Sequence, residues 1–309
     1  MIKDFKVGEK LDGYFILNDV QIRTASNNKP YLTGKLADIT GSMDFQVWDY
    51  SGLLSSENNG SVVDVSGEIR EYKGQKQMTV FSIDVLDDYS DVDLSKLVKQ
   101  APIDSDKAMK YLEETISQIG DEDYRKVTSV IFDRHKERFS VIPAAKTVHH
   151  GFISGLLMHT SYMVRIADSL AGIYKSIIDR DLLISGTILH DFAKEYEFEV
   201  SDLGMVKDYS IKGELLGHIV MGASEVAEVC KELEIPEEKS VLLQHMILSH
   251  HGDPEFGAAV KPLIAEAELL SYIDMIDSRM EIYKENMADI EKGEFSKKIF
   301  ALDKRILKH

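Results

Sequence analysis

The first 90 residues carry short runs of β-branched and aromatic residues in which apolar and polar positions partly alternate. Such alternation is typical of strands, whose successive side chains point to opposite faces. The segments between the runs contain the Gly, Pro and Asn that turns require. We expect strands near residues 13–17, 31–36, 43–48, 61–67 and 77–83. A small barrel is the natural closure, because a closed barrel leaves no sheet edge unpaired.

After an acidic and polar stretch at residues 87–93, the apolar residues take up helical spacing. Met109, Leu112 and Ile116 recur every three or four residues, and Asp104 or Ser105 is suited to cap the start of their helix. We expect helices near residues 104–119, 121–139, 152–171, 180–193, 213–234, 238–250 and 262–284. The change of pattern predicts an all-β domain followed by an all-α domain.

The expected organisation has four parts. Residues 1–90 form the barrel, 91–145 a helical linker region, 146–284 the main helical domain and 285–309 a C-terminal helical tail. The alternating charges of the tail are typical of a solvated helix. A chain of 309 residues is long for a single core, which favours more than one domain.

Composition is that of a folded globular protein, with 44% hydrophobic and 29% charged residues. No apolar run approaches the roughly 18 to 20 residues needed to cross a bilayer, and Met1–Phe5 lacks the apolar block of a signal peptide. We therefore expect a cytoplasmic protein without a membrane partner. The single cysteine, Cys230, lies among apolar helical residues, so we expect a buried thiol.

The net charge of −17 argues against indiscriminate binding to a polyanion. Residues 1–90 contain 9 Lys and Arg against 14 Asp and Glu, a charge of −5, which leaves −12 for the rest. Contact with nucleic acid would therefore depend on local basic patches or on metal ions. Modest, salt-sensitive affinity is expected, and a homo-oligomer would supply more contacts to one strand.

The candidate chemistry lies in the helical half, since no histidine occurs in the first 90 residues. His159, His190, His218 and His250 each interrupt an apolar helical stretch, and Asp191 follows His190 directly. A lone histidine on an apolar face is usually a core or capping residue. Burying several imidazoles and a carboxylate without partners is costly, however, and a divalent ion satisfies them together. The pattern predicts a metal site.

An acidic ligand is expected from the helix near residues 262–284. Asp274 lies in its most apolar part, where a ligand would face inward. Asp277 follows three positions later on nearly the same face, so periodicity leaves both open. The neighbouring Ser278 and Arg279 are suited to pair with Asp277.

The ordered set His159, His190-Asp191 and Asp274 resembles the H…HD…D signature of the HD superfamily of metal phosphohydrolases. His218 and His250 fall where two-metal members of that superfamily add ligands, and the alignment favours Asp274 over Asp277. The His-Asp doublet alone is a weak signal. The full order on consecutive predicted helices is specific.

The resemblance covers nearly the whole chain. An OB-type barrel joined to an HD domain in a chain of this size is similar to the YhaM-type 3′-to-5′ exoribonucleases. The fold class implied is multidomain: a small all-β OB-type barrel followed by an all-α HD domain. The matching stretches are residues 13–15, 29–32, 36–41, 47–49 and 149–159.

The resemblance implies a site for two ions. Asp191 would bridge them, His159, His190 and Asp274 would hold one, and His218 and His250 the other. Two such ions, roughly 3.5–4 Å apart, activate a water and stabilise charge on the scissile phosphate. Mixed imidazole and carboxylate donors suit several metals; the resemblance favours Mn²⁺, with Fe, Zn, Co and Mg as alternatives.

Further residues are candidates for contact with the substrate. Lys194 lies one helical turn beyond His190 and close to Asp191, where it would either bind a phosphate oxygen or pair with Glu195 or Glu197 in solvent. His251 is either a partner of the ligands or a substrate contact. His149 and His150 are expected to contact the substrate at a helix entrance.

OB-type barrels bind single strands by stacking bases on aromatic rings while basic side chains follow the backbone. Lys29, Tyr31 and Lys73 are the candidates of first choice. The alternative is that most aromatics fill the small core; alternation places Phe45 on the opposite face from Trp48.

These features predict an enzyme that removes nucleotides from the 3′ end of single-stranded RNA, with single-stranded DNA as a second substrate. Asp191 and Lys194 are the expected catalytic residues. One alternative is an HD phosphohydrolase for free or cyclic nucleotides, with the barrel used for assembly. Another is a non-catalytic single-strand-binding protein whose metal site is structural.

Overall fold

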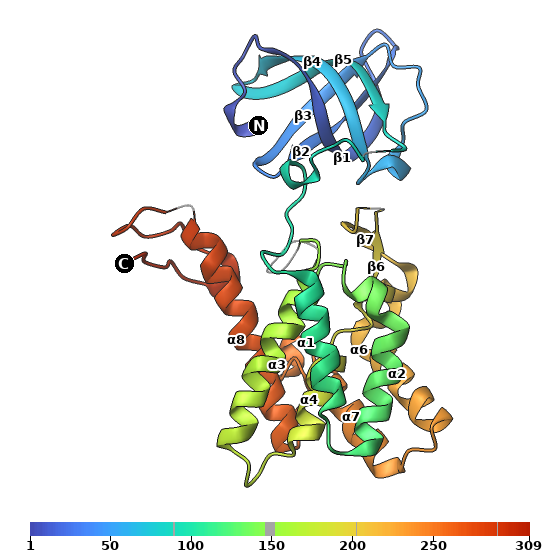
Figure 1. Ribbon diagram of the computed structural model, residues 1–309. Coiled ribbons are helices and arrows are strands. Elements are labelled where there is room, and N and C mark those ends of the chain that lie inside the picture. Colours follow the sequence, from blue (N-terminus) through green and yellow to red (C-terminus); the bar gives the residue numbers. More distant parts are fainter. Residues whose placement is uncertain (89, 146–151, 202, 289) are drawn as a thin grey trace. The chain divides into compact units, whose positions relative to one another are not determined.

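The computed structural model describes residues 1–309 except 89, 146–151, 202 and 289. The described chain divides into two compact units. The first comprises residues 1–100 and 200–207, and the second residues 101–199 and 208–309. The first is largely β-structure and the second largely helical (Figure 1).

The first unit is built on a closed barrel with the strand order β1-β2-β3-β5-β4 (Figure 1). Neighbouring strands are antiparallel except β3 and β5, whose parallel pairing completes the barrel. This confirms the predicted OB-type barrel. Its strands are β1 (Lys10–Thr24), β2 (Pro30–Asp38), β3 (Gly41–Trp48), β4 (Val62–Tyr72) and β5 (Gln75–Val85).

The barrel core follows from strand alternation. Along β2, Leu32, Gly34 and Leu36 are buried, while the residues between them are more exposed. Gly34 is required by close packing, since a Cβ there would lie 2.8 Å from Cε1 of Phe45. Phe45 itself is buried in the core, as the alternation indicated.

The second unit contains the helices that carry the candidate site (Figure 1). Several begin at an aspartate whose carboxylate accepts backbone N–H groups of the first turn: Asp104, Asp121 and Asp179. A short sheet of β6 (Phe198–Val200) and β7 (Val206–Tyr209) interrupts the helical pattern. The helices are α1 (Ser105–Ser117), α2 (Glu122–Phe139), α3 (Gly155–Ile173), α4 (Arg180–Leu189), α5 (Lys194–Glu197), α6 (Ile211–Glu232), α7 (Glu237–Ser249) and α8 (Ala265–Ala288).

The expected linker region, residues 91–145, is corrected by the structure. The boundary between the units falls after Gln100, and α1 and α2 are part of the helical unit. Leu112 of α1 and Ile131 of α2 are fully buried, and their helices pack against α3, α4 and α6. The apolar stripes of these helices therefore belong to the core of the second unit.

The expected helical tail, residues 285–309, is also corrected. Helix α8 ends at Ala288, and the segment after it folds back through isolated bridges that pair Phe295 with Leu307 and Ile299 with Lys304. Gly293, with φ +90°, adopts a backbone conformation that a helix does not use. The apolar residues of the segment pack on α8 around Ile282, Leu302 and Ile306.

No helix within the described residues is long and apolar enough to span a bilayer.

Candidate metal centre

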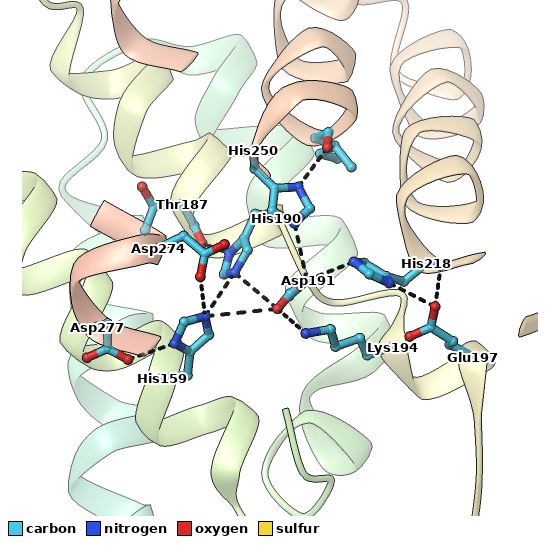
Figure 2. A network of polar contacts seen from close by, with 11 residues as sticks. His159, Thr187, His190, Asp191, Lys194, Glu197, His218, His250, Asp274 and Asp277 are labelled. Atoms are coloured by element: carbon cyan, nitrogen blue, oxygen red, sulfur yellow. Dashed lines mark hydrogen bonds and ion pairs between the residues drawn. The ribbon is translucent and has the colours of Figure 1, made fainter. Parts of the chain in front are cut away.

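Helices α3, α4, α6, α7 and α8 each bring a histidine or an aspartate to one buried cluster in the second unit (Figure 2). The histidines are almost inaccessible: His159 is 2% exposed, His190 1% and His250 0%. Unpaired polar groups at such depth are costly, so the contacts of each ring decide what the cluster can bind.

His190 and His250 occupy the C-cap positions of α4 and α7. In each ring Nδ1 lies 2.7 Å from the carbonyl oxygen three residues earlier, that of Thr187 or of Ile247. Nδ1 must donate this hydrogen bond, because a carbonyl only accepts. In the neutral tautomer that this contact selects, Nε2 carries the lone pair and faces the cluster, the arrangement that binds metals.

His218 is placed by a break in α6. Gly217 has φ +70° and ψ 159°, outside the helical region, so the helix interrupts there and restarts at His218. The backbone N–H and the ring Nδ1 of His218 both donate to Oε1 of Glu197, at 3.0 and 2.9 Å. Glu197 thus orients the ring and leaves Nε2 facing Asp191 (Figure 2).

From the sequence, Glu197 was expected only as a partner of Lys194, and its contact with His218 was not predicted. A signal for this contact was present in the sequence, because two glycines, Gly213 and Gly217, precede His218 in an apolar helical stretch. Gly213 lies so close to α5 that a Cβ there would be 2.2 Å from the carbonyl oxygen of Glu197. The absent side chain at Gly213 lets the segment carrying Glu197 approach α6, while Gly217 supplies the backbone conformation of the break.

The first ligand set comprises His159, His190 and Asp274, whose ligand atoms lie within 4.8 Å of one another. Nε2 of His159 is 3.3 Å from Oδ1 of Asp274 and 3.3 Å from Nε2 of His190. Asp277 lies on the other side of the ring, with Oδ2 2.7 Å from Nδ1 of His159. The two aspartates that periodicity could not separate therefore have different positions: Asp274 faces the cluster, and Asp277 orients His159.

The second ligand set comprises Asp191, His218, His250 and His251, again with ligand atoms within 4.8 Å. Three atoms that face one another there are buried and have no hydrogen-bond partner in the described part of the chain: Oδ1 of Asp191, Nε2 of His218 and Nε2 of His250. Oδ1 of Asp191 is 3.2 Å from Nε2 of His218 and 3.5 Å from that of His250, without hydrogen-bond geometry. Three such atoms, with a ring nitrogen of His251 near them, fit a divalent cation.

Asp191 lies between the two sets. Oδ1 faces the second set, while Oδ2 is 3.2 Å from Nε2 of His190 and 4.0 Å from Nε2 of His159 in the first. Oδ2 also accepts a 2.6 Å hydrogen bond from Nζ of Lys194, with which it forms an ion pair. Lys194 is nearly buried and faces the cluster, so it is not a solvated surface lysine.

The electrostatics favour ligands ready for a cation. Burial alone would raise the pKa of Asp191, but the charge of Lys194 and the nearby His190 outweigh it and hold the pKa well below its ordinary value. Burial lowers the pKa of His251 to about 3 and also lowers that of His250. These rings are neutral and the carboxylate is ionised at neutral pH, as metal binding requires.

His159 differs from these rings. Burial alone would lower its pKa, but Asp274 and Asp277, one at each ring nitrogen, raise it to about 9. Two carboxylates around one imidazole favour a positive charge at this point, and a divalent ion in the first ligand set would supply it.

Comparison with known proteins agrees with this architecture. Residues 156–279 match the model of the HD domain family, which spans all the cluster residues. Over 97% of this chain and 93% of its own length, the 3′-5′ exoribonuclease YhaM of Halalkalibacterium halodurans is 36% identical. This chain belongs to the YhaM family. The YhaM protein of Shouchella clausii is 35% identical over 98% of this chain and 94% of its own length.

Not every predicted site residue of this YhaM-family chain lies in the cluster. His251 was expected as a partner of the ligands or as a substrate contact. It lies instead in the second ligand set, with Asp191, His218 and His250. His149 and His150 lie outside the described residues. Lys29 and Tyr31 belong to the barrel unit, as does Lys73.

Of the three barrel candidates, Lys29 and Lys73 are exposed and Tyr31 is partly buried. Tyr31 stacks on Trp48 with 5.0 Å between ring centroids, and Trp48 is 53% exposed. Nζ of Lys73 lies 5.2 Å above the ring of Tyr72. Lys29, by contrast, pairs with Asp49 at 2.9 Å, so its charge is already balanced. The aromatic pair is better disposed to meet a base than Lys29 is to meet a phosphate.

Proposed function

We propose that this protein is a metal-dependent 3′-5′ exoribonuclease that hydrolyses the phosphodiester bonds of single-stranded RNA and, as a second substrate, single-stranded DNA. The observation that carries the proposal is the convergence of two ligand sets on Asp191 within the HD domain of a YhaM-family chain. The alternative, a purely structural site, needs only four protein ligands around one ion. It would not require a second ligand set.

The cluster would hold two ions, for which Mn²⁺ is our first choice. Asp191 would bridge them, with His159, His190 and Asp274 on one side and His218, His250 and His251 on the other. Bound ions would supply the Lewis-acid charge that phosphodiester hydrolysis requires. His251 is thereby reassigned from a substrate contact to a ligand, because one of its ring nitrogens lies within 4.8 Å of the ligand atoms of Asp191, His218 and His250.

Lys194 would hold Asp191 ionised and offer a positive charge to a phosphate oxygen. Its Nζ carries three hydrogens, and its hydrogen bond to Asp191 uses one of them. A compact ammonium beside a carboxylate between two ion sites suits a point contact to a non-bridging oxygen.

The barrel would feed the strand to the cluster, with Tyr31, Trp48 and Tyr72 as stacking platforms and Lys73 near the backbone. A cytoplasmic location fits RNA as substrate. Assembly into a homo-oligomer would multiply weak barrel contacts on one strand. His149 and His150 remain candidate substrate contacts.

The test compares degradation ladders of one single-stranded RNA labelled at its 5′ or its 3′ end, with Mn²⁺ present. A 3′-5′ exonuclease shortens the 5′-labelled strand stepwise and releases the 3′ label as a mononucleotide. Cleavage of free or cyclic nucleotides alone would replace the exonuclease by a nucleotide phosphohydrolase.

The matched variant is Asp191→Ala, examined for folding by circular dichroism. We expect it to fold and to lose activity by at least about 10³-fold, because both ligand sets lose their shared residue. Turnover at the wild-type rate would contradict the assignment. Strand binding without turnover in the wild-type protein would favour a non-catalytic binding protein.

A further inference from the structure

A pocket of about 460 Å³ opens beside the cluster within the helical unit. We call it the α8 pocket. One end reaches ligands of both sets, Asp274 of the first and His250 with His251 of the second. The volume falls in the lower part of the roughly 300–1,000 Å³ typical of small-molecule sites, the size of a single nucleotide rather than a strand. The rest of its lining is Phe256, Ser271, Met275, Ser278, Arg279, Ile282 and Ala301.

The lining away from the ligands is largely apolar and partly open to solvent. Phe256, next to the end of α7, is 69% exposed, and Met275 of α8 is 44% exposed. Ile282 and Ala301 lie further along the pocket, where the C-terminal segment packs on α8. An aromatic ring and a thioether exposed beside a polar cluster form a surface against which a base can pack.

Arg279 provides the pocket with a cation. The sequence suggested that it pairs with Asp277, but Asp277 contacts His159 instead. Within the described residues no acidic partner for the Arg279 guanidinium is recorded, whereas Arg134 and Arg180 both pair with carboxylates. In a chain with a net charge of −17, a guanidinium without a carboxylate partner among the described residues, beside a cluster suited to phosphodiester chemistry, is suited to bind phosphate.

We propose that the α8 pocket binds the 3′-terminal nucleotide of the substrate, with Arg279 on its phosphate and Phe256 and Met275 against its base. The proposal rests on the proposed exonuclease function. It also gives the direction of the strand, because the 3′ end would lie in the α8 pocket. The terminal nucleotide, released as a mononucleotide, would occupy the pocket, and the rest of the strand would leave the cluster on another side. The hydroxyls of Ser271 and Ser278 donate to backbone carbonyls of α8, so they are not free to donate to a base, and we expect weak base preference.

The test measures binding of a nucleoside 5′-monophosphate to the metal-loaded full chain by equilibrium dialysis, alongside RNA degradation. Arg279→Gln should weaken mononucleotide binding about tenfold or more, the size of a lost charge-assisted hydrogen bond. Phe256→Ala should weaken it about fivefold or more through lost stacking. In both variants KM for RNA should rise more than kcat falls, with the metal content unchanged.

Arg165→Gln is the matched control, because Arg165 is an exposed arginine of α3 that stacks on Tyr111 and does not line the pocket. It makes the same charge change and should bind the mononucleotide like wild type. Equal binding in Arg279→Gln and Arg165→Gln, or no binding by wild type at millimolar mononucleotide, would overturn the pocket assignment. Loss of binding in Arg279→Gln without RNA shortening by wild type would keep the pocket and refute the exonuclease function.

Discussion

His159 shows how two neighbouring carboxylates on one helix can take different roles. Asp274 lies 3.3 Å from Nε2, the nitrogen that faces the cluster, while Asp277 lies 2.7 Å from Nδ1, on the far side of the ring. A partner on the second nitrogen fixes the ring and its tautomer without touching the metal. Replacing the two aspartates should therefore give two different defects.

Asp274→Asn should remove a ligand, so the protein should retain less of the ion in the first set and lose most activity. Asp277→Asn should keep both ions at saturating metal but weaken affinity by about 10- to 100-fold, the usual effect of losing an orienting partner. Metal titration followed by elemental analysis separates the two results. Identical stoichiometry and affinity in both variants would contradict the assignment.

The sequence predicted which residues meet at the cluster better than it predicted their roles. His159, His190, Asp191, His218, His250 and Asp274 all lie there, because each follows or interrupts an apolar helical run that had to be buried. Glu197 and the ligand position of His251 were missed. Their roles depend on the break in α6 and on the turn after α7. The spacing of apolar residues in the sequence indicates neither feature.

At the scale of elements, the interruption of α6 determines whether the second ligand set forms. Gly217→Ala should strain the backbone by about 1–3 kcal/mol, since φ +70° with ψ 159° is almost restricted to glycine. Relief of that strain would move the N–H of His218 away from Glu197. We expect weaker binding of the second ion, measured by metal titration, and at least about tenfold lower activity.

Gly172→Ala is the control for this change. Gly172 lies in α3, has ordinary helical geometry and has open space around its Cβ position. Alanine there should leave metal binding unchanged and raise stability slightly, by about 0.5–1 kcal/mol. If the two glycine variants titrate metal alike, the interruption at Gly217 does not position His218.

Helix α2 is joined to α5 and α6 by a buried histidine. Nδ1 of His135 is 2.6 Å from Glu195 of α5, and Nε2 is 2.8 Å from Glu225 of α6. Burial alone would lower the pKa of His135, but hydrogen bonds to the two glutamates raise it to about 9. The charged imidazole therefore holds the short helix that carries Lys194 and Glu197.

This contact predicts a pH dependence of stability. A pKa raised from 6.5 to about 9 stabilises the fold fully below pH 6.5, and the contribution is lost as pH rises through about 9. His135→Gln should therefore be less stable than wild type by on the order of 2–3 kcal/mol at pH 6 and by much less at pH 10. Urea unfolding followed by circular dichroism measures the difference.

His245→Gln should show the opposite trend, because burial lowers the pKa of His245. The folded state disfavours that charge, so the wild-type histidine costs stability at acidic pH, and its replacement should help there. A difference between His135→Gln and wild type that is constant from pH 6 to 10 would show that His135 contributes by packing alone.

Most element positions followed from apolar spacing, whereas the tail did not. Residues after Ala288 alternate charge in a way that also suits a solvated helix. Gly293 and the apolar residues that pack on α8 instead favour the folded-back arrangement. Long-range packing of this kind is not encoded in local periodicity, and α1 and α2 were misplaced in a linker for the same reason.

At the scale of the whole molecule, charge and stacking have to be weighed together. The chain carries −17 overall, and Lys29 and Lys35 of the barrel are paired with Asp49 and Asp19. Phosphate neutralisation by these two lysines is therefore limited, and the stacked pair of partly buried Tyr31 and exposed Trp48 becomes the main resource of the barrel for single strands. Affinity should then depend less on salt than in a basic OB-type barrel.

Trp48→Ala tests that balance. Stacking of one base is worth about 1–3 kcal/mol, so KM for a long single-stranded RNA should rise roughly 5- to 100-fold. The same variant should degrade an RNA of a few nucleotides with unchanged KM and kcat, because a short strand reaches the HD cluster without the barrel.

Phe81→Ala is the control, since Phe81 is a barrel aromatic outside the stacked pair and its side chain is similarly exposed, at 57%. An equal loss on long and short RNA would place Trp48 in support of the fold rather than in strand binding.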